Sequence, residues 1–422
     1  MHILKYNTFN RLIFVFWTLA ALSSCSSSEK KAEPKESEPT RSNNQIQQQL
    51  EQWQDNKLSL FVHYGVYSKL AGKWNETAVE GPAEEIWSRS GMFSDDYEKA
   101  ARDFTPNQWD SETITELARD IGVRTIVFSA KHLDGFCLFD TETTRFNSLD
   151  FATFGKDVME DMTHACENAG INLAIRFSLT DWHLPAAYPM AGHHSNPVSD
   201  AHHQTNLQQI RELLTNYGPI SAVHFHSGLN TPAQSRELYE LVKELQPQCL
   251  VSNGIGNNFG DFISTRFNQS PAYPLNIPWQ LPASLHPATL GHHEALDRKP
   301  AIEKAREKVR EMVGAITSGG HYALNLGPKG NGIPAQYEEE TLRHMGRWIK
   351  VNRNAIFGTK EALFSKNPGL WHTTRKENQL YIFTDSVPAS ETILLQGLDN
   401  EIEEARFLGS GIELEVARKG ES

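Results

Sequence analysis

The stretch that decides the fold is residues 125–136, which have the sequence TIVFSAKHLDGF. Its first part, residues 125–129, is apolar and β-branched, which is typical of a strand buried in a parallel sheet. Lys131, His132 and Asp134 follow it closely. In parallel barrels the active site lies at the carboxyl ends of the strands. We therefore expect these three side chains to face a pocket.

Three further apolar runs end in polar residues in the same way: residues 61–63, 175–178 and 223–226. The first run ends at His63, the second precedes Asp181, and the third ends at His226. A single strand with a polar end would prove little. Several such strands together predict the rim of an active site.

Strand-like and helix-like segments alternate from about residue 46 onward. The expected strands are residues 58–64, 125–129, 172–177, 222–225, 250–252, 261–264 and 322–326. The expected helices are residues 109–121, 158–169, 204–215, 236–245, 301–317 and 337–352. This alternation predicts a parallel sheet, and its length favours a (β/α)8 barrel over residues 46–358. One strand before residue 322 cannot be placed, because the proline-rich stretch 271–290 interrupts the rhythm.

The predicted secondary structure changes near residue 359 to a series of strands without helices between them. The expected strands there are residues 379–383, 392–395 and 412–414. We expect residues 359–422 to form a small antiparallel β-domain, shorter than a usual sandwich of ~100 residues.

Composition narrows the functional classes. Hydrophobic residues make up 39% of the 422 residues, enough for a large core, and the formal net charge of −12 argues against nucleic acid as a partner. The aromatic content, with 9 tryptophans, suits sugar stacking but also suits any large core. Cys137, Cys166 and Cys249 are scattered and odd in number, which indicates buried thiols.

The first 25 residues are typical of an export signal. Lys5 and Arg11 supply positive charge, and the apolar run 12–22 is too short to span a bilayer. The run closes on Cys25 after small residues, as in a bacterial lipoprotein signal. We expect lipidation of Cys25, a disordered tether over residues 26–45, and a protein held at a membrane of the cell envelope.

Six motifs together resemble the α-L-fucosidase family of glycoside hydrolases. They are FVHYGVYS at 61–68, GKW at 72–74, KHLDGF at 131–136, DWH at 181–183, YGPI at 217–220 and ALNLGP at 323–328. The resemblance runs from about residue 53 to 359. It implies a barrel followed by a β-sandwich, and action on terminal L-fucose of an oligosaccharide or glycoconjugate. It also implies a retaining mechanism with two carboxylates and no metal or organic cofactor.

The resemblance carries over to several sugar-binding positions. His63 matches the histidine that holds ring hydroxyls, and His132 matches the first of two adjacent histidines, the second being Leu133 here. Trp74 matches an aromatic beside the sugar, and Glu84 matches a carboxylate on the loop that follows.

Four more residues complete the predicted sugar-binding set. They are Lys131, Trp182, Trp279 and Arg266. Arg266 has two interpretations: a salt-bridged loop residue, or a guanidinium that faces a sulfate or carboxylate on the sugar.

The catalytic carboxylates of the family do not carry over. Alignment on residues 217–220 puts His226 at the position of the nucleophilic aspartate, and counting from Asp261 puts Arg266 at the acid/base glutamate. A neutral imidazole supplies no negative charge to an oxocarbenium-like centre, and such a loss typically costs roughly 10³-fold in rate. We therefore expect weak or absent hydrolysis of ordinary α-L-fucosides.

Three functions stay open. In the first, the chain is a glycoside hydrolase whose catalytic region contains His226, Asp134 and Glu84, with Asp181, Asp261 and Glu294 as further candidate carboxylates. In the second, the pocket binds carbohydrate at the cell surface without cutting it.

The third function is metal binding by the three histidines at separate strand ends, His63, His132 and His226. Neutral imidazoles suit zinc and copper. A lone histidine is more often a hydrogen-bonded wall residue, and we expect no metal or other cofactor.

Overall fold

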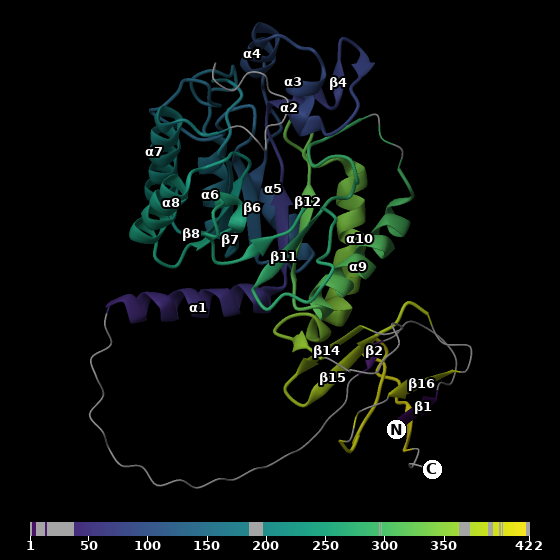
Figure 1. Ribbon diagram of the computed structural model, residues 1–422. Coiled ribbons are helices and arrows are strands. Elements are labelled where there is room, and N and C mark those ends of the chain that lie inside the picture. Colours follow the sequence, from purple (N-terminus) through teal and green to yellow (C-terminus); the bar gives the residue numbers. More distant parts are fainter. Residues whose placement is uncertain are drawn as a thin grey trace.

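The computed structural model describes residues 2–5, 13–14, 38–184, 197–294, 296, 298–362, 372–386, 391–395, 398 and 400–418 (Figure 1). Cys25 and most of the predicted signal peptide and tether lie outside the described residues. Within the described part, no helix combines the length and the apolar character needed to cross a bilayer.

Eight parallel strands form one curled sheet in the order β10-β11-β12-β3-β6-β7-β8-β9. They are β3 (Leu58–Val62), β6 (Thr125–Lys131), β7 (Asn172–Ser178), β8 (Ile220–His226), β9 (Leu250–Val251), β10 (Ile263–Ser264), β11 (Trp279–Ala283) and β12 (His321–Leu326). A parallel bridge between Ser252 and Phe262 joins the two edges of the sheet. The predicted (β/α)8 barrel is therefore confirmed.

Helices surround this sheet. They are α5 (Ser111–Asp120), α6 (Val158–Ala169), α7 (Asp200–Asn216), α8 (Pro232–Leu245), α9 (Ala301–Thr317) and α10 (Gln336–Asn352). Between β9 and β11 the only helical element in the described chain is the short η4 (Asn253–Ile255). The strand that the sequence could not place is β11, whose Pro282 interrupts the usual pattern of a buried strand.

Local side chains determine where these helices begin. Asp110, Asp157 and Ser199 each accept hydrogen bonds from backbone N–H groups in the first turns of α5, α6 and α7. Thr231 caps α8 in the same way, and Pro232 follows at its first position. The helix starts thus come from short-range hydrogen bonds that the sequence encodes directly.

A group of short elements covers the carboxyl ends of the strands, at the top of Figure 1. It consists of α2 (Val66–Leu70), β4 (Lys73–Trp74), β5 (Thr77–Ala78), η1 (Ala83–Glu85), α3 (Ile86–Arg89) and α4 (Ser94–Arg102). All of them belong to the connection between β3 and β6, which is the longest insertion near the mouth of the barrel.

The helix α1 (Glu38–Asn56) crosses the opposite, amino end of the barrel (Figure 1). Ile46, Leu50 and Trp53 recur at helical spacing and join the cluster that fills the barrel interior. The Trp53 ring stacks on His321 with 4.4 Å between centroids. Because α1 begins at Glu38, residues 38–45 of the predicted tether are helical.

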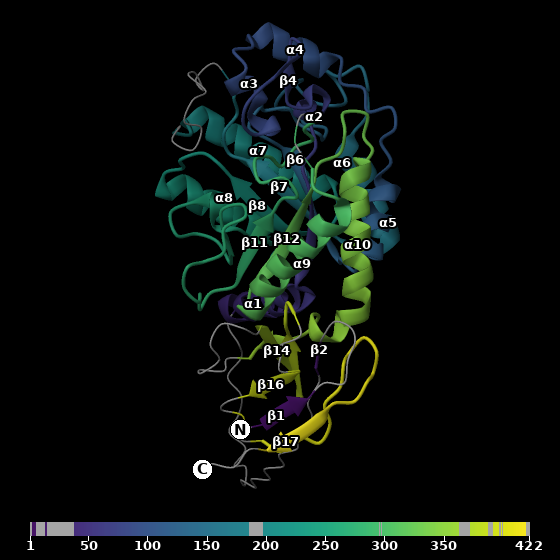
Figure 2. The same ribbon diagram turned by 90° about the vertical axis from the view of Figure 1, so that its right-hand side faces the viewer.

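Two antiparallel sheets combine strands that follow the barrel with β1 and β2, which precede it, and share a small core that includes Leu380, Ile393 and Phe407 (Figure 2). One sheet has the order β13 (Lys360–Glu361), β14 (His372–Lys376), β15 (Gln379–Phe383) and β2 (Ile13–Phe14). The other has the order β16 (Thr392–Leu395), β1 (His2–Lys5) and β17 (Glu415–Arg418). The last strand begins three residues later than the predicted strand 412–414.

We predict that α1 stabilises the barrel by sealing its amino end. Trp53→Ala removes a buried indole that packs on His321, and should lower the free energy of unfolding by about 3–5 kcal/mol. Gln52→Ala, an exposed position of the same helix, should change it by less than ~0.5 kcal/mol. Urea unfolding of both variants checks this, and equal small effects would show that α1 does not support the barrel.

Candidate active site

Three histidines from three strand ends come together at the mouth of the barrel. His63 follows β3, His132 follows β6, and His226 ends β8. The ring centroids of His63 and His132 are 5.9 Å apart, and those of His132 and His226 are 5.7 Å apart. The structure therefore brings together three residues that the sequence predicted at separate positions. We call them the histidine cluster.

His63 is fully buried, and its partner fixes its chemical form. Its Nδ1 lies in hydrogen-bond contact with Oδ1 of Asn325 on β12. The amide of Asn325 donates to the Leu290 carbonyl at 2.6 Å, so its Oδ1 accepts from His63. Nε2 of His63 then carries a lone pair and has no partner among the described residues.

The charge state of His63 agrees with this hydrogen bond. Burial holds the pKa of His63 well below its usual value, and Arg176 and His132 lower it further. The ring is therefore neutral near pH 7. A neutral imidazole with a free lone pair is suited to accept a hydrogen bond from a hydroxyl group.

Arg176 on β7 is a site residue to which the sequence analysis assigned no role. Its side chain is only 5% exposed, and its guanidinium carbon lies 5.4 Å from the Phe61 ring centroid and 5.6 Å from that of Phe267. Burial lowers the pKa of Arg176 to about 10, so the group stays charged at neutral pH. A charged residue on the inward face of a barrel strand is the signal that could have revealed it.

Phe267 takes the place in the site that the sequence analysis gave to its neighbour. Arg266 is exposed on the loop after β10. The Phe267 ring instead lies 5.8 Å from the ring of His63. Adjacent residues of an extended loop point in different directions, and the sequence alone could not decide which of the two faces the histidine cluster.

Glu84, one of the predicted catalytic residues, is hydrogen-bonded to the loop after β11. Its carboxylate accepts hydrogen bonds from the Thr289 hydroxyl at 2.9 Å and from the backbone N–H groups of Leu290 and Gly291 at 3.1 and 3.0 Å. Burial raises the pKa of Glu84, and these donors oppose that shift. The group therefore ties η1 to the loop after β11.

Asp134 is also occupied by protein groups. One carboxylate oxygen accepts from the Tyr97 hydroxyl at 2.5 Å, and the other accepts from the Phe136 N–H at 3.2 Å. Burial raises the pKa of Asp134 to about 7. Asp134 thus connects the turn after β6 to α4.

The other candidate carboxylates have partners as well. Asp181 accepts from the His183 N–H at 2.9 Å. Glu294 is exposed and pairs with Lys73 at 2.9 Å.

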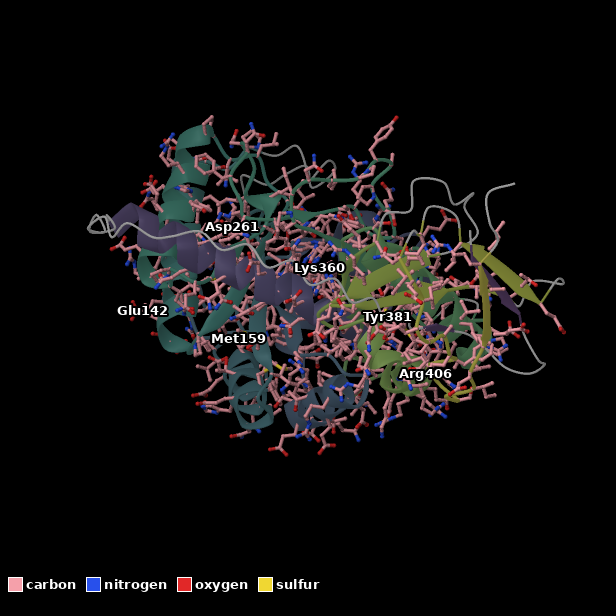
Figure 3. The ribbon with its side chains drawn as sticks, turned by 90° about the horizontal axis from the view of Figure 1, so that it is seen from below. Glu142, Met159, Asp261, Lys360, Tyr381 and Arg406 are labelled. Atoms are coloured by element: carbon pink, nitrogen blue, oxygen red, sulfur yellow. The ribbon has the colours of Figure 1, made fainter. Side chains whose placement is uncertain are left out.

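Asp261 lies at the opposite end of the barrel. It precedes β10, on the side that α1 crosses, and is labelled in the view from below (Figure 3). It pairs with Lys243 at 2.7 Å and accepts from the Tyr239 hydroxyl at 2.7 Å. Distance from the mouth excludes Asp261 from the site.

Lys131 does not face the mouth. The pairing of β6 with β7 shifts register between Ser129 and Lys131, and this bulge turns the lysine outward. Its Nζ donates to Asn206 at 3.0 Å and to Gln209 at 2.7 Å, both on α7. The predicted role of Lys131 in sugar binding is therefore corrected.

The three predicted tryptophans lie in different places. Trp279 starts β11 at the amino end of the barrel and packs over Gly320, so it is far from the mouth. Trp182 is fully buried in the main core. Trp74 is half-buried in the β4–β5 hairpin above the mouth.

The arrangement is suited to binding oxygen-rich groups. It contains a neutral imidazole with a free lone pair, a buried guanidinium and an aromatic wall. Within the described ranges, no three His, Cys, Asp or Glu side chains group closely enough to hold a metal ion. The carboxylates nearby each hold a turn or a loop.

Comparison with known proteins places this geometry in context. Residues 24–354 match the family model described as Alpha-L-fucosidase. The α-L-fucosidase of Dictyostelium discoideum is 21% identical over 393 residues, which cover 85% of this chain and 83% of that protein.

Solved structures agree in fold. Isoenzyme 1 of the α-L-fucosidase from Paenibacillus thiaminolyticus is 27% identical, with a TM-score of 0.75 over 87% of this chain and 90% of that one. A GH29 α-L-fucosidase from Bacteroides thetaiotaomicron, trapped as a covalent intermediate with 2-fluoro-fucosyl fluoride, is 21% identical, with a TM-score of 0.78 over 93% of each chain.

We predict that Asp134 makes stability depend on pH. Its folded-state pKa of about 7 lies above the ~3.9 of an unfolded chain, so the folded protein binds more protons between these values. The stability that this group contributes is full below about pH 4 and is lost as the pH rises through about 7.

Asp134→Asn should therefore flatten the fall in melting temperature between pH 5 and pH 8, as measured by differential scanning fluorimetry. Glu338, whose pKa burial also raises to about 7, should keep part of the slope. Asp103→Asn, on the surface, is the control. An unchanged slope in Asp134→Asn would contradict the assignment.

Proposed function

Because the chain belongs to the α-L-fucosidase family of glycoside hydrolases, we propose that its barrel mouth binds terminal L-fucose, or a related sulfated sugar, on extracellular glycans. The histidine cluster lies where barrels of this kind bind their ligands, at the carboxyl ends of the strands. His63 supplies an acceptor for a sugar hydroxyl, and Phe267 supplies an apolar face.

The proposed mechanism depends on which residue would attack the anomeric carbon of the sugar. A covalent glycosyl intermediate, as trapped in the Bacteroides relative, needs an attacking group on the protein. Alignment on residues 217–220 puts His226 at that position in this chain, and an imidazole offers no negative charge to a developing oxocarbenium ion. We propose that sugar binding persists here and that hydrolysis through such an intermediate is weak or absent.

A second candidate function is hydrolysis with a relocated acid. Asp134 supports it, because a carboxyl group whose pKa is about 7 suits proton transfer near neutral pH. Its hydrogen bonds to Tyr97 and Phe136 oppose it, since both would have to break before the group could reach a substrate.

We predict slow turnover of an aryl α-L-fucoside. Hydrolysis should be about 10³-fold or more below that of an active family member, as followed by release of the aryl alcohol. Turnover in the normal range would refute the proposal.

The variant His226→Asp tests the cause. With 2-fluoro-fucosyl fluoride, whose leaving group needs little acid assistance, the aspartate variant should gain the mass of one fluorofucosyl group. The wild type and the neutral control His226→Asn should gain none. Labelling of all three proteins would place the nucleophile elsewhere.

We also propose that the chain is an exported lipoprotein, anchored to a membrane of the cell envelope through Cys25. The charged start, the short apolar run and the small residues before Cys25 support this. Cleavage there would remove β1 and β2, so the mature C-terminal domain would form its sheets without these two strands.

We predict that the wild-type chain, expressed in a bacterium, sediments with membranes and begins at a lipidated Cys25. Cys25→Ala should move it to the soluble fraction or leave it unprocessed, whereas Cys166→Ala, at a buried cysteine, should not. Mass spectrometry of the N-terminal peptide shows whether the mature chain begins at a lipidated Cys25. A purified chain that retains residues 2–5 would contradict the proposal.

A further inference from the structure

The charge of Arg176 has no ion-pair partner among the residues that the structure describes. Among the described residues no carboxylate lies within ion-pair distance of its guanidinium, and its Nε makes no hydrogen bond. Its side chain is nine-tenths or more buried. A buried ionised group without a partner is strongly unfavourable, and proteins usually pair such a group or use it for binding.

The carboxylate that influences the charge of Arg176 already has other hydrogen-bond partners. Glu84 is close enough to influence Arg176 electrostatically. Its carboxylate, however, accepts from Thr289, Leu290 and Gly291. Glu84 therefore offsets part of the positive potential but does not take up the guanidinium N–H groups.

The neighbours on the inner face of the barrel are neutral. Arg176 pairs in register with His224 on β8, whose pKa burial lowers to about 3. The Gln280 amide on β11 donates to His224 Nδ1 at 3.1 Å. Phe61 and Phe267 contact the guanidinium but accept no conventional hydrogen bond. The inner wall thus holds a positive charge that Glu84 offsets only in part.

We propose that Arg176 is an anion-binding residue of the sugar site, and that the sugar it selects carries a carboxylate or a sulfate group. This inference rests on the proposed sugar-binding function. The guanidinium edge can pair with two oxygens of either anion at once. His63 Nε2, whose ring lies 5.8 Å from that of Phe267 beside Arg176, accepts from a hydroxyl of the same sugar.

The same charge is consistent with the lack of a nucleophilic carboxylate. A cation at the mouth disfavours a positively charged oxocarbenium-like centre and favours an anionic ground state. Arg176 and His226 therefore point to the same kind of ligand, a negatively charged sugar that is held and not cleaved by double displacement.

The test compares neutral and anionic sugars that share the ring configuration of L-fucose. Isothermal titration with L-fucose, L-galacturonate and the monosulfates of L-fucose measures the ratio of their affinities. At least one anionic sugar should bind the wild type roughly 10- to 100-fold more tightly than L-fucose. In Arg176→Met this preference should disappear, and in Arg176→Lys, which keeps the charge but not the paired donors, it should fall in between.

The matched control is Arg236→Met. Arg236 lies on α8, is exposed, and contacts the Phe259 ring at 5.6 Å, so it has the same residue type and a similar aromatic contact. The preference of Arg236→Met for anionic sugars over L-fucose should equal that of the wild type. If Arg176→Met does not fold, Arg176→Lys keeps the test valid, because it retains the buried charge.

The outcomes separate the two proposals. Equal affinity of the wild type for neutral and anionic sugars, or an unchanged preference in Arg176→Met, would overturn this inference and leave sugar binding intact. If the wild type binds none of these sugars, the proposed function itself fails. A loss of preference confined to the Arg176 variants supports the inference.

Discussion

The hydrogen bond between His63 and Asn325 is the interaction on which the barrel mouth depends. It joins β3, the first strand of the barrel, to β12, the last, at the end of their paired region, where the His63 N–H also donates to the Leu326 carbonyl at 2.9 Å. Because Asn325 also donates to the Leu290 carbonyl, the loop after β11 is held in the same network. The network fixes one tautomer of His63 and so decides that this wall presents an acceptor.

The carboxylates near the mouth illustrate a second constraint, which is the cost of burying charge. Glu84 in η1 and Asp134 after β6 are distant in the sequence from most of their partners. Each is surrounded by hydrogen-bond donors that offset part of the cost of removing its carboxylate from water. A carboxylate that closes a loop in this way is held by the fold. Among the described residues, His63 and Arg176 each keep a buried polar atom without a hydrogen-bond partner at this site. We therefore distinguish binding residues from structural residues by whether their polar atoms have protein partners, and not by residue type.

Much of the barrel could be predicted from the sequence, because short-range patterns encode it. Helices α6 and α9 have the predicted bounds, since apolar periodicity determines both locally and Asp157 caps the start of α6. β11 could not be placed because Pro282 within it, and Pro278 just before it, are unusual in a buried strand. In the site, the convergence of His63, His132 and His226 followed from their positions at strand ends. The outward turn of Lys131 did not, because a bulge depends on how two strands pair, and the pairing of Asp134 with Tyr97 depends on a contact across 37 positions of the chain.

The position of α1 has a geometric consequence for the whole particle. This helix crosses the base of the barrel, so its first residue, Glu38, lies on that side of the molecule (Figure 1). Under the proposal that Cys25 carries a lipid, the anchor would join the described chain at Glu38, on the base side of the barrel. The histidine cluster would then open toward the surrounding medium, where long polymers approach from outside and never need to pass between the protein and the lipid headgroups.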